Sequence, residues 1–458
     1  MRIWTGRAGS GKTTAILQEI AALCARDEGR QILLVPELNS HQMERHLAAA
    51  TGNHGARTAE VLTFSRLADR VFSEVGGLAQ QMLTPAGQLL TLQEAARRVQ
   101  GGLSAWEGLA DKPELLREAL RLVDECKTCA VAPEALFAAS EECEDAALAA
   151  KLGDLAQLLT AYERLCDESL PDPRDRLTHL RDRLADSHVL DGAAVYLDGF
   201  LGFTPQELAV VDAMLAAGVP LAAAVTCDMA FPEIFVTGCK TVKTLTRMAK
   251  RHNRTAEQID LGAGRIARPA GLAALERESL LPVRTAHEDA RGVCLYAAAS
   301  PFDECEHAAA YIRRKVRDEG ARYRDFVVCA RDIEPYTAFL AMAMARYDVP
   351  VFLAEKPDLL SRPPMAMVVG ALAAAESYFQ YEDLFGCLKT GLTSLTRDEV
   401  DKLENYALTW NIRGGAWERD WTEHPDGYGL PFDDRSRAQL TELNELRARA
   451  IAPFSALR

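Results

Sequence analysis

Residues 6–13 of this 458-residue chain read GRAGSGKT, which matches the phosphate-binding pattern G-x-x-x-x-G-K-T. The stretch follows a short apolar strand pattern, MRIWTG, and precedes a helical pattern, KTTAILQEIAALCAR. This strand–loop–helix context is the one in which the pattern is specific. Glycines at these positions let backbone amides curl around phosphate oxygens where a Cβ would intrude. The sequence therefore predicts an α/β fold that opens on a phosphate loop.

Each residue type in the loop has a chemical role in binding ATP. We expect Lys12 to reach the β- and γ-phosphates and the Thr13 hydroxyl to hold Mg²⁺. The helix that begins after the loop adds the positive end of its dipole. The predicted nucleotide-binding residues of the loop are Gly6, Arg7, Ala8, Gly9, Ser10, Gly11, Lys12 and Thr13.

Hydrolysis of ATP also needs a carboxylate at the end of a neighbouring strand and, usually, a second acid that activates water. Asp198 ends the apolar strand pattern VYLD and is the candidate second ligand of Mg²⁺, although an Asp-Gly pair is also common in turns. The next residue is Gly199, and the nearest acid, Glu207, lies inside the following helical pattern. The sequence predicts ATP–Mg²⁺ binding with little or no turnover.

Strand and helix patterns alternate in two parts of the chain, which favours parallel sheets. We predict a first α/β lobe from 1–83 and 188–262, interrupted by a helical insertion at 84–187. A linker is predicted at 263–291, and the start of a second α/β lobe at 292–370. The predicted strands are 1–6, 31–37, 59–64, 193–198 and 219–228 in the first lobe, and 292–300, 325–332 and 349–355 in the second. Residues 371–458 are predicted to be helical, and because no closing element follows them we expect the chain to continue.

The net charge of −14 argues against a surface that is coated for nucleic-acid binding. A local channel is compatible with that charge, because phosphate contacts need only a few well-placed Arg and Lys residues. The sequence has no apolar run long enough to span a membrane and no signal-peptide pattern at its N-terminus, so we expect a cytoplasmic protein with no membrane association.

The chain has eleven cysteines, which a cytoplasmic protein keeps as free thiols. Only Cys126 and Cys129 form a C-x-x-C, which is half of a metal site at most. The pair lies in a helical pattern without a second half-site, and we interpret both cysteines as ordinary helix residues.

Several stretches, in order, resemble the AddB subunit of the bacterial AddAB helicase–nuclease, a UvrD-like superfamily-1 relative. They are GRAGSGKT, LLVPELNSHQME, AEVLTFSRLADRVF, VYLDGFLGFTPQE and YEDLFGCLKTGL with DKLENYALTWNIRGGAW. The resemblance covers nearly the whole chain but only the N-terminal part of a family member. It implies two RecA-like lobes with a helical insertion in the first.

The resemblance also implies a role in processing double-strand DNA ends for recombinational repair, in a heterodimer whose active motor is an AddA-type subunit. The AddB-type subunit is then a degenerate helicase that holds ATP and scans the unwound single strand for a Chi-type signal. Active relatives carry Asp-Glu where this chain has Asp198-Gly199, which agrees with the missing acid. In VVCARD, Arg331 matches an arginine that lies near the γ-phosphate in active relatives, or it is a surface loop residue.

The family reads DNA with the loops after the second and third strands, and these positions carry over to a set of candidate DNA-binding residues. They are Ser40, Phe64, Ser65, Arg66 and Phe203. The two aromatic rings would stack on bases, or they would pack in the core instead. Leu38 stands where the family usually has glutamine, so this chain lacks a side-chain amide that could contact a base edge of a Chi sequence. The nuclease site and iron–sulfur cluster of the family lie near its C-terminus, so no residue here is assigned to them.

Three other classes of protein remain as alternatives. An active UvrD-like motor is disfavoured by Gly199, and a small-molecule kinase by the second α/β segment from residue 292 onward. A nucleotide-binding scaffold would show a nucleotide-dependent shift in melting temperature without affinity for DNA.

Overall fold

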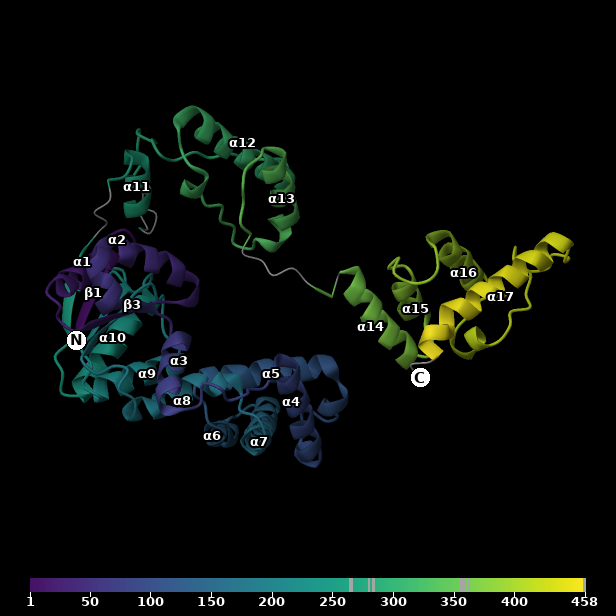
Figure 1. Ribbon diagram of the computed structural model, residues 1–458, viewed down its shortest axis with the longest axis horizontal. Coiled ribbons are helices and arrows are strands. Elements are labelled where there is room, and N and C mark those ends of the chain that lie inside the picture. Colours follow the sequence, from purple (N-terminus) through teal and green to yellow (C-terminus); the bar gives the residue numbers. More distant parts are fainter. Residues whose placement is uncertain (263–266, 279–280, 282–284, 354–358, 361, 456–458) are drawn as a thin grey trace. The chain divides into compact units, whose positions relative to one another are not determined.

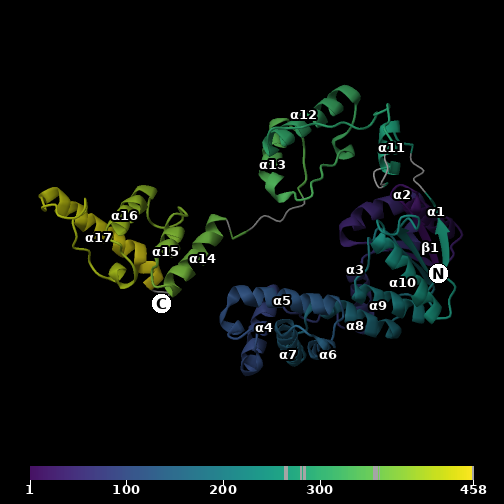
Figure 2. The same ribbon diagram turned by 180° about the vertical axis from the view of Figure 1, so that it is seen from behind.

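The computed structural model describes residues 1–262, 267–278, 281, 285–353, 359–360 and 362–455. The chain divides into a first unit, Met1–Cys294, and a second unit, Leu295–Arg458 (Figures 1 and 2). Each unit is described by itself below.

The first unit is built on one six-stranded parallel sheet with the strand order β3-β2-β4-β5-β1-β6. The strands are β1 (Arg2–Gly6), β2 (Arg30–Leu34), β3 (Ala59–Leu62), β4 (Ala193–Leu197), β5 (Leu221–Thr226) and β6 (Glu257–Asp260). The expected strands of the first lobe are confirmed, whereas β6 was not expected. Its residues EQID are exposed or half-buried, so they lack the apolar pattern of the central strands.

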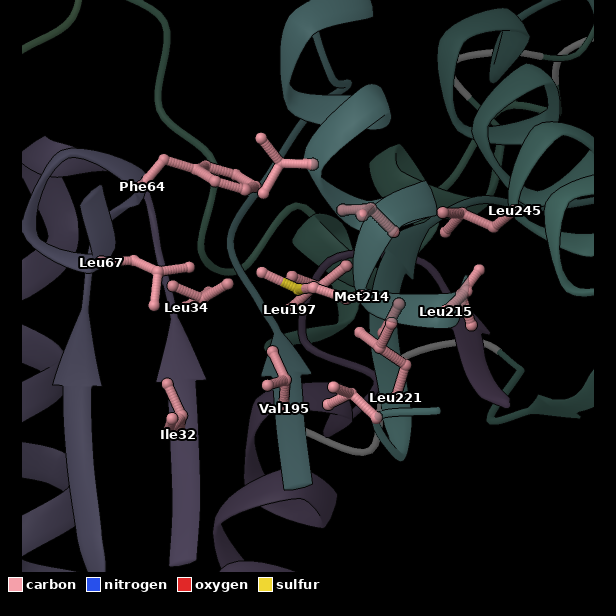
Figure 3. Packing of buried hydrophobic residues seen from close by; sticks show 14 of the residues in the cluster. Ile32, Leu34, Phe64, Leu67, Val195, Leu197, Met214, Leu215, Leu221 and Leu245 are labelled. Atoms are coloured by element: carbon pink, nitrogen blue, oxygen red, sulfur yellow. The ribbon is translucent and has the colours of Figure 1, made fainter. Parts of the chain in front are cut away.

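Neighbouring residues of the central strands face opposite sides of the sheet, because side chains alternate along a strand. Ile32, Leu34 and Val195 belong to one core cluster, and Leu33 and Tyr196 belong to another. Figure 3 shows Leu34 and Leu197 near Met214 of helix α9 (Pro205–Ala216), which covers this face. Phe64 lies beyond the carboxyl ends of the strands. The sheet is therefore buried on both faces, as βαβ connections require.

Helices connect and cover the strands of the first unit. They are α1 (Lys12–Ala25), α2 (Ser40–Thr58), α3 (Phe64–Val75), α8 (Arg176–Arg183), α9 (Pro205–Ala216), α10 (Val236–Arg251) and α11 (Ala270–Glu278). The face that holds Leu33 packs on Ile16 and Ile20 of α1. The opposite face packs on α9 and α10 through residues such as Met214 and Leu245.

A helical segment lies between β3 and β4 in the chain and has its own core, beside the sheet in Figure 1. Its helices are α4 (Pro85–Val99), α5 (Pro113–Thr128), α6 (Pro133–Glu142) and α7 (Ala146–Glu168). The fully buried carboxylate of Asp172 links α4 and α7, because it accepts hydrogen bonds from Gln88 Nε2 at 2.9 Å and from the Tyr162 hydroxyl at 3.0 Å. Lys127 Nζ lies 3.6 Å from the same carboxylate and 2.6 Å from Asp175.

The second unit is helical in its described residues. Its helices are α12 (Pro301–Glu319), α13 (Thr337–Arg346), α14 (Pro363–Glu376), α15 (Tyr381–Leu388), α16 (Arg397–Thr409) and α17 (Asp434–Ser455). The last four share a core around the fully buried Trp417.

The second parallel sheet that the sequence predicts is not found among these residues. Described residues of the expected strands 292–300, 325–332 and 349–355 form no strand, and 354–355 lie outside the description. A strand needs a hydrogen-bonded neighbour, and these segments do not pair with one another. Each segment has an apolar side chain that stays largely exposed, as Leu295 at 99%, Val327 at 84% and Phe352 at 90% show.

The predicted linker at 263–291 is not irregular throughout, because α11 forms within it. Residues 263–266, 279–280 and 282–284 of that segment lie outside the described residues, as do 456–458 at the end of the chain.

Cys126 lies buried in α5, and Cys129 is exposed at its C-terminal cap. Within the described part, no group of three or more His, Cys, Asp or Glu side chains could hold a metal ion.

Candidate nucleotide and nucleic-acid site

The phosphate loop, residues 6–13, turns sharply between β1 and α1. Gly9 and Gly11 have φ values of 75° and 91°, which disfavour any side chain. A Cβ on Gly6 would lie 2.5 Å from Ser10 Oγ, so the loop closes too tightly for a larger residue. No side chain caps the N-terminus of α1. Its first amides are therefore suited to phosphate oxygens.

The buried ammonium of Lys12 is held against the loop itself. Its Nζ donates to the carbonyl oxygens of Gly6 at 2.8 Å and Arg7 at 2.9 Å, and lies 3.5 Å from Ser10 Oγ. Burial lowers the pKa of Lys12, and the charge of Asp198 opposes that shift. An anion at the loop would offer Lys12 stronger, charge-assisted partners than these neutral carbonyls.

Asp198 follows the end of β4 and is 3% exposed. Burial raises its pKa, while hydrogen bonds from the Thr13 hydroxyl and the Gly199 amide and the charge of Lys12 oppose that rise. Its Oδ2 has no hydrogen-bond partner in the described part of the chain. A buried carboxylate oxygen without a partner costs free energy. A hard cation between Asp198 and Thr13 would supply the missing interaction, so these residues fit Mg²⁺.

The position after Asp198 cannot easily carry the acid found in active relatives. Gly199 has a φ of 80°, and a Cβ there would lie 3.0 Å from Asn39 Nδ2. The nearest acid of the following helix, Glu207, is engaged in a capping box with Thr204. Its Oε2 accepts the Thr204 amide at 2.8 Å.

Arg7 joins the phosphate loop to the segment after β5. Its Nε lies 2.7 Å from Asp228 Oδ2, and its guanidinium lies 5.1 Å from the ring centre of Phe231. Burial works against ionisation of Asp228, but hydrogen bonds from Arg7 and the Ala230 amide outweigh it and lower the pKa of Asp228. Sequence reasoning missed Asp228, because its link to Arg7 spans 221 positions.

A groove of about 630 Å³ lies at the carboxyl ends of β2, β3 and β4. We call it the strand-end groove. It is lined by Val35, Pro36, Glu37, Leu38, Asn39, Thr63, Phe64, Ser65, Thr128, Pro173, Arg174, Arg176, Leu177, Gly199, Phe200, Leu201, Gly202, Thr204, Gln206 and Glu207. Sequence reasoning missed the contribution of Arg174 and Arg176, because the helical segment brings them there from a distant part of the chain.

The candidate DNA-binding residues do not all face this groove. Ser65 is exposed and lines it, whereas Arg66 pairs with Glu44 at 2.6 Å and lines a separate hollow of about 680 Å³ beside the edge strand β3. Ser40 is half-buried, and its hydroxyl donates to the carbonyl oxygen of Glu37 at 3.1 Å.

The two aromatic candidates belong to one cluster with Phe200. Phe64 is 6% exposed and meets Phe200 edge to face at 5.7 Å. The rings of Phe200 and Phe203 lie 4.7 Å apart. This geometry favours the packing interpretation for Phe64. Leu38 and Leu201, at 97% and 83% exposed, are the accessible apolar side chains of the groove.

Arg331 belongs to the second unit, whereas the phosphate loop belongs to the first. It lines a hollow of about 450 Å³ with Cys305 and Tyr336.

Comparison with known proteins gives a consistent result. A family model described as "ADDB, N-terminal" matches residues 3–276. A protein of Acetivibrio thermocellus that is named as the B subunit of an ATP-dependent helicase/deoxyribonuclease is 31% identical over 475 aligned positions, covering 100% of this chain and 41% of the relative. A protein of the same name from Desulforamulus reducens is 33% identical, covering 98% and 41% respectively. The chain thus spans about two fifths of the length of these curated relatives. No helix among the described residues is both long and apolar enough to cross a membrane.

Proposed function

This chain belongs to the AddB family, and we propose that it forms the N-terminal part of the AddB-type subunit of an ATP-dependent helicase/deoxyribonuclease. In this proposal, the complex processes double-strand DNA ends in the cytoplasm for recombinational repair. The AddB-type subunit holds ATP and the unwound single strand, and an AddA-type subunit is the motor. The observation that carries the proposal is a well-formed phosphate loop that lies beside Asp198. The residue after Asp198 is Gly199, where an active motor would have an acid.

The nucleotide part of the proposal gives each residue of the loop a role. The backbone of residues 6–11 and the start of α1 hold the phosphates, and Lys12 moves from the Gly6 and Arg7 carbonyl oxygens to the phosphate oxygens. Thr13 and Asp198 hold Mg²⁺, which would neutralise phosphate charge. Arg331 keeps its role as a candidate ligand of the γ-phosphate, on the family match alone. Because no acid beside Asp198 activates water, ATP is held with little turnover.

The nucleotide test measures binding of a fluorescent ATP analogue to the purified chain, with and without Mg²⁺. Lys12→Ala is expected to weaken binding at least tenfold, and Thr13→Val is expected to remove the dependence on Mg²⁺. Lys151→Ala, at an exposed residue of the helical segment, is the matched control and should bind as the wild type does. A robust ATPase rate that Lys12→Ala abolishes would contradict the proposed lack of turnover.

The DNA part of the proposal places a single strand along the strand-end groove. Carboxyl ends of parallel strands are where ligands of α/β proteins commonly bind. Ser65 and Arg174 contact phosphates, while Leu38 and Leu201 contact bases. Phe64 supports the floor of the groove through Phe200. These apolar side chains carry little sequence information, which favours binding without strong preference for a particular sequence.

The other family-matched residues take flanking roles in this proposal. Phe203 extends the aromatic cluster and stacks on a base at the groove edge. Ser40 orients the turn before α2, and Arg66 contacts a phosphate once it leaves Glu44. Residues 292–370 belong, in this proposal, to the start of a second RecA-like lobe.

The DNA test measures fluorescence anisotropy of a labelled single-stranded oligonucleotide. Leu38→Asp and Leu201→Asp put a negative charge in the groove and are expected to weaken binding about tenfold each. Leu148→Asp, at a residue of α7 that is 48% exposed, adds the same charge away from the groove and should have little effect. Equal losses in all three variants would refute the groove as the binding site.

The partner test is co-purification of the chain with the AddA-type subunit of its own organism. Nucleotide-dependent stabilisation without affinity for DNA or for that subunit would favour a nucleotide-binding scaffold instead.

A further inference from the structure

Helix α10 carries a row of basic side chains that neither the phosphate loop nor the strand-end groove uses. Its sequence, VTGCKTVKTLTRMAKR, contains basic residues but no Asp or Glu. This is unusual in a chain with 66 acidic and 52 basic residues. We define the basic face of α10 as Lys240, Lys243, Arg247 and Lys250.

The spacing of the four residues puts them on one side of the helix. Steps of three and four positions return to the same face of an α-helix. All four residues are exposed, while Val242, Leu245 and Met248 on the other side are buried in the core of the first unit. α10 packs beside α9 (Figures 1 and 2). At about 1.5 Å per residue, the row is roughly 15 Å long.

The charges of this face are not compensated within the described part of the chain. Arg251, one position further on, pairs with Asp212 at 3.3 Å, but none of the four forms such an ion pair. The only hydrogen bonds of the Arg247 side chain among described residues go to Lys243 O and Thr244 Oγ1, within its own helix.

The arrangement costs the helix stability rather than supporting it. Like charges three or four positions apart repel each other. The helix dipole favours Lys250, which lies in the last turn, but Lys240 and Lys243 lie outside the first and last turns and gain nothing from it. The repulsion within the row is therefore not offset inside the helix, and an external polyanion would relieve it.

We propose that the basic face of α10 binds the phosphate backbone of duplex DNA. The inference rests on the proposed function in DNA processing but concerns a second surface, separate from the single-strand groove. Over about 15 Å, one strand of a duplex presents roughly four phosphates, which matches the four cations. The exposed residues of α10 include no aromatic ring. Single-strand sites combine cations with stacking rings, so the face fits duplex backbone better.

The test compares duplex and single-stranded DNA of equal length, using the Lys240→Gln/Lys243→Gln/Arg247→Gln triple variant. For duplex DNA, the slope of log K against log salt is expected to fall by about 3, since each phosphate contact contributes about 0.9. Duplex affinity at low salt is expected to drop at least tenfold, with single-strand affinity within about twofold of the wild type. Binding of the ATP analogue and the melting temperature check that the fold is intact.

The matched control is Arg117→Gln/Arg121→Gln/Lys151→Gln in the helical segment, which removes the same net charge from exposed positions. Equal weakening by both triple variants would show a general charge effect and overturn the inference. An unchanged duplex slope, or an equal loss on single strands, would also overturn it. Loss of binding to the AddA-type subunit with duplex affinity intact would assign the face to an acidic protein surface instead. A wild-type chain that binds no DNA would refute the proposed function as well. If single strands still bind the strand-end groove but the triple variant leaves the salt slope for duplex DNA unchanged, only the present inference is refuted.

Discussion

Phe64 gives the sharpest test of the structural reasoning, because packing and base stacking predict opposite results. The ring is 6% exposed and meets Phe200 edge to face at 5.7 Å. Replacing a buried Phe by Ala costs about 3–5 kcal/mol in the free energy of unfolding. Phe64→Leu keeps most of the buried apolar surface but loses the aromatic pair, which is worth about 0.5–1.5 kcal/mol. We therefore expect a large loss of stability for Phe64→Ala and a loss of about 1 kcal/mol for Phe64→Leu.

The assays are urea unfolding, followed by circular dichroism and tryptophan fluorescence, and anisotropy with a labelled single strand. If Phe64 packs, Phe64→Leu should leave DNA affinity within about twofold of the wild type. If Phe64 stacks on a base, the same change should remove about 1–3 kcal/mol of binding energy with little effect on stability. Leu38→Ala is the control in which DNA affinity should fall while stability is kept. Because Leu38 is 97% exposed, its replacement should change stability by less than about 0.5 kcal/mol.

One combination of results would refute the packing argument. It is a Phe64→Ala variant that loses less than about 1 kcal/mol of stability while its affinity for single strands falls tenfold or more. Weak binding by Phe64→Ala alone would not distinguish packing from stacking, because a destabilised groove also binds DNA poorly. The DNA affinity of Phe64→Leu therefore distinguishes the two.

Three further predictions follow from the same structure. Gly199→Glu should not create ATPase activity and should cost about 1–3 kcal/mol of stability, because its φ of 80° and the nearby Asn39 strain any side chain; a stable variant that hydrolyses ATP would contradict this. The Arg7–Asp228 pair should show a coupling of about 1 kcal/mol in a double-mutant cycle of urea unfolding. The pKa of Asp228 is lowered in the folded protein, so the stabilisation by this pair is fully present above the ordinary pKa of 3.8 and is lost as the pH falls through the folded-state pKa. A coupling energy that grows on acidification would contradict this prediction. Asp172→Ala should destabilise the helical segment by about 2–4 kcal/mol, because it leaves two buried donors without an acceptor, while Lys127 keeps its closer partner Asp175. An unchanged unfolding midpoint would show that this network contributes nothing.

Local patterns in the sequence were sufficient for much of the first unit. The strand before Gly6, the phosphate loop and the start of α1 follow from residues that are adjacent in the chain, so their chemistry is readable without a fold. The apolar runs around Ile32 and Val195 likewise predicted buried parallel strands, which the sheet confirms. The edge strand β6 was missed because a half-exposed strand lacks that apolar run.

In the second unit, apolar composition alone does not establish strands. The segments at 292–300, 325–332 and 349–353 have the composition of buried strands, but no described strand forms there. Composition measures the tendency of a segment to be buried, whereas a strand exists only when a distant segment supplies the hydrogen bonds.

The sequence by itself determined the phosphate loop, the candidate carboxylate at the end of a strand and the absence of an acid at Gly199. Each of these depends on residue identity and on spacing along one element. Only the tertiary structure decided that Phe64 is buried, that Arg66 faces a different hollow from Ser65 and that Arg174 enters the groove. It also decided that the four cations of the basic face of α10 form no ion pair among the described residues. These outcomes depend on contacts between residues far apart in the chain, which no local pattern encodes.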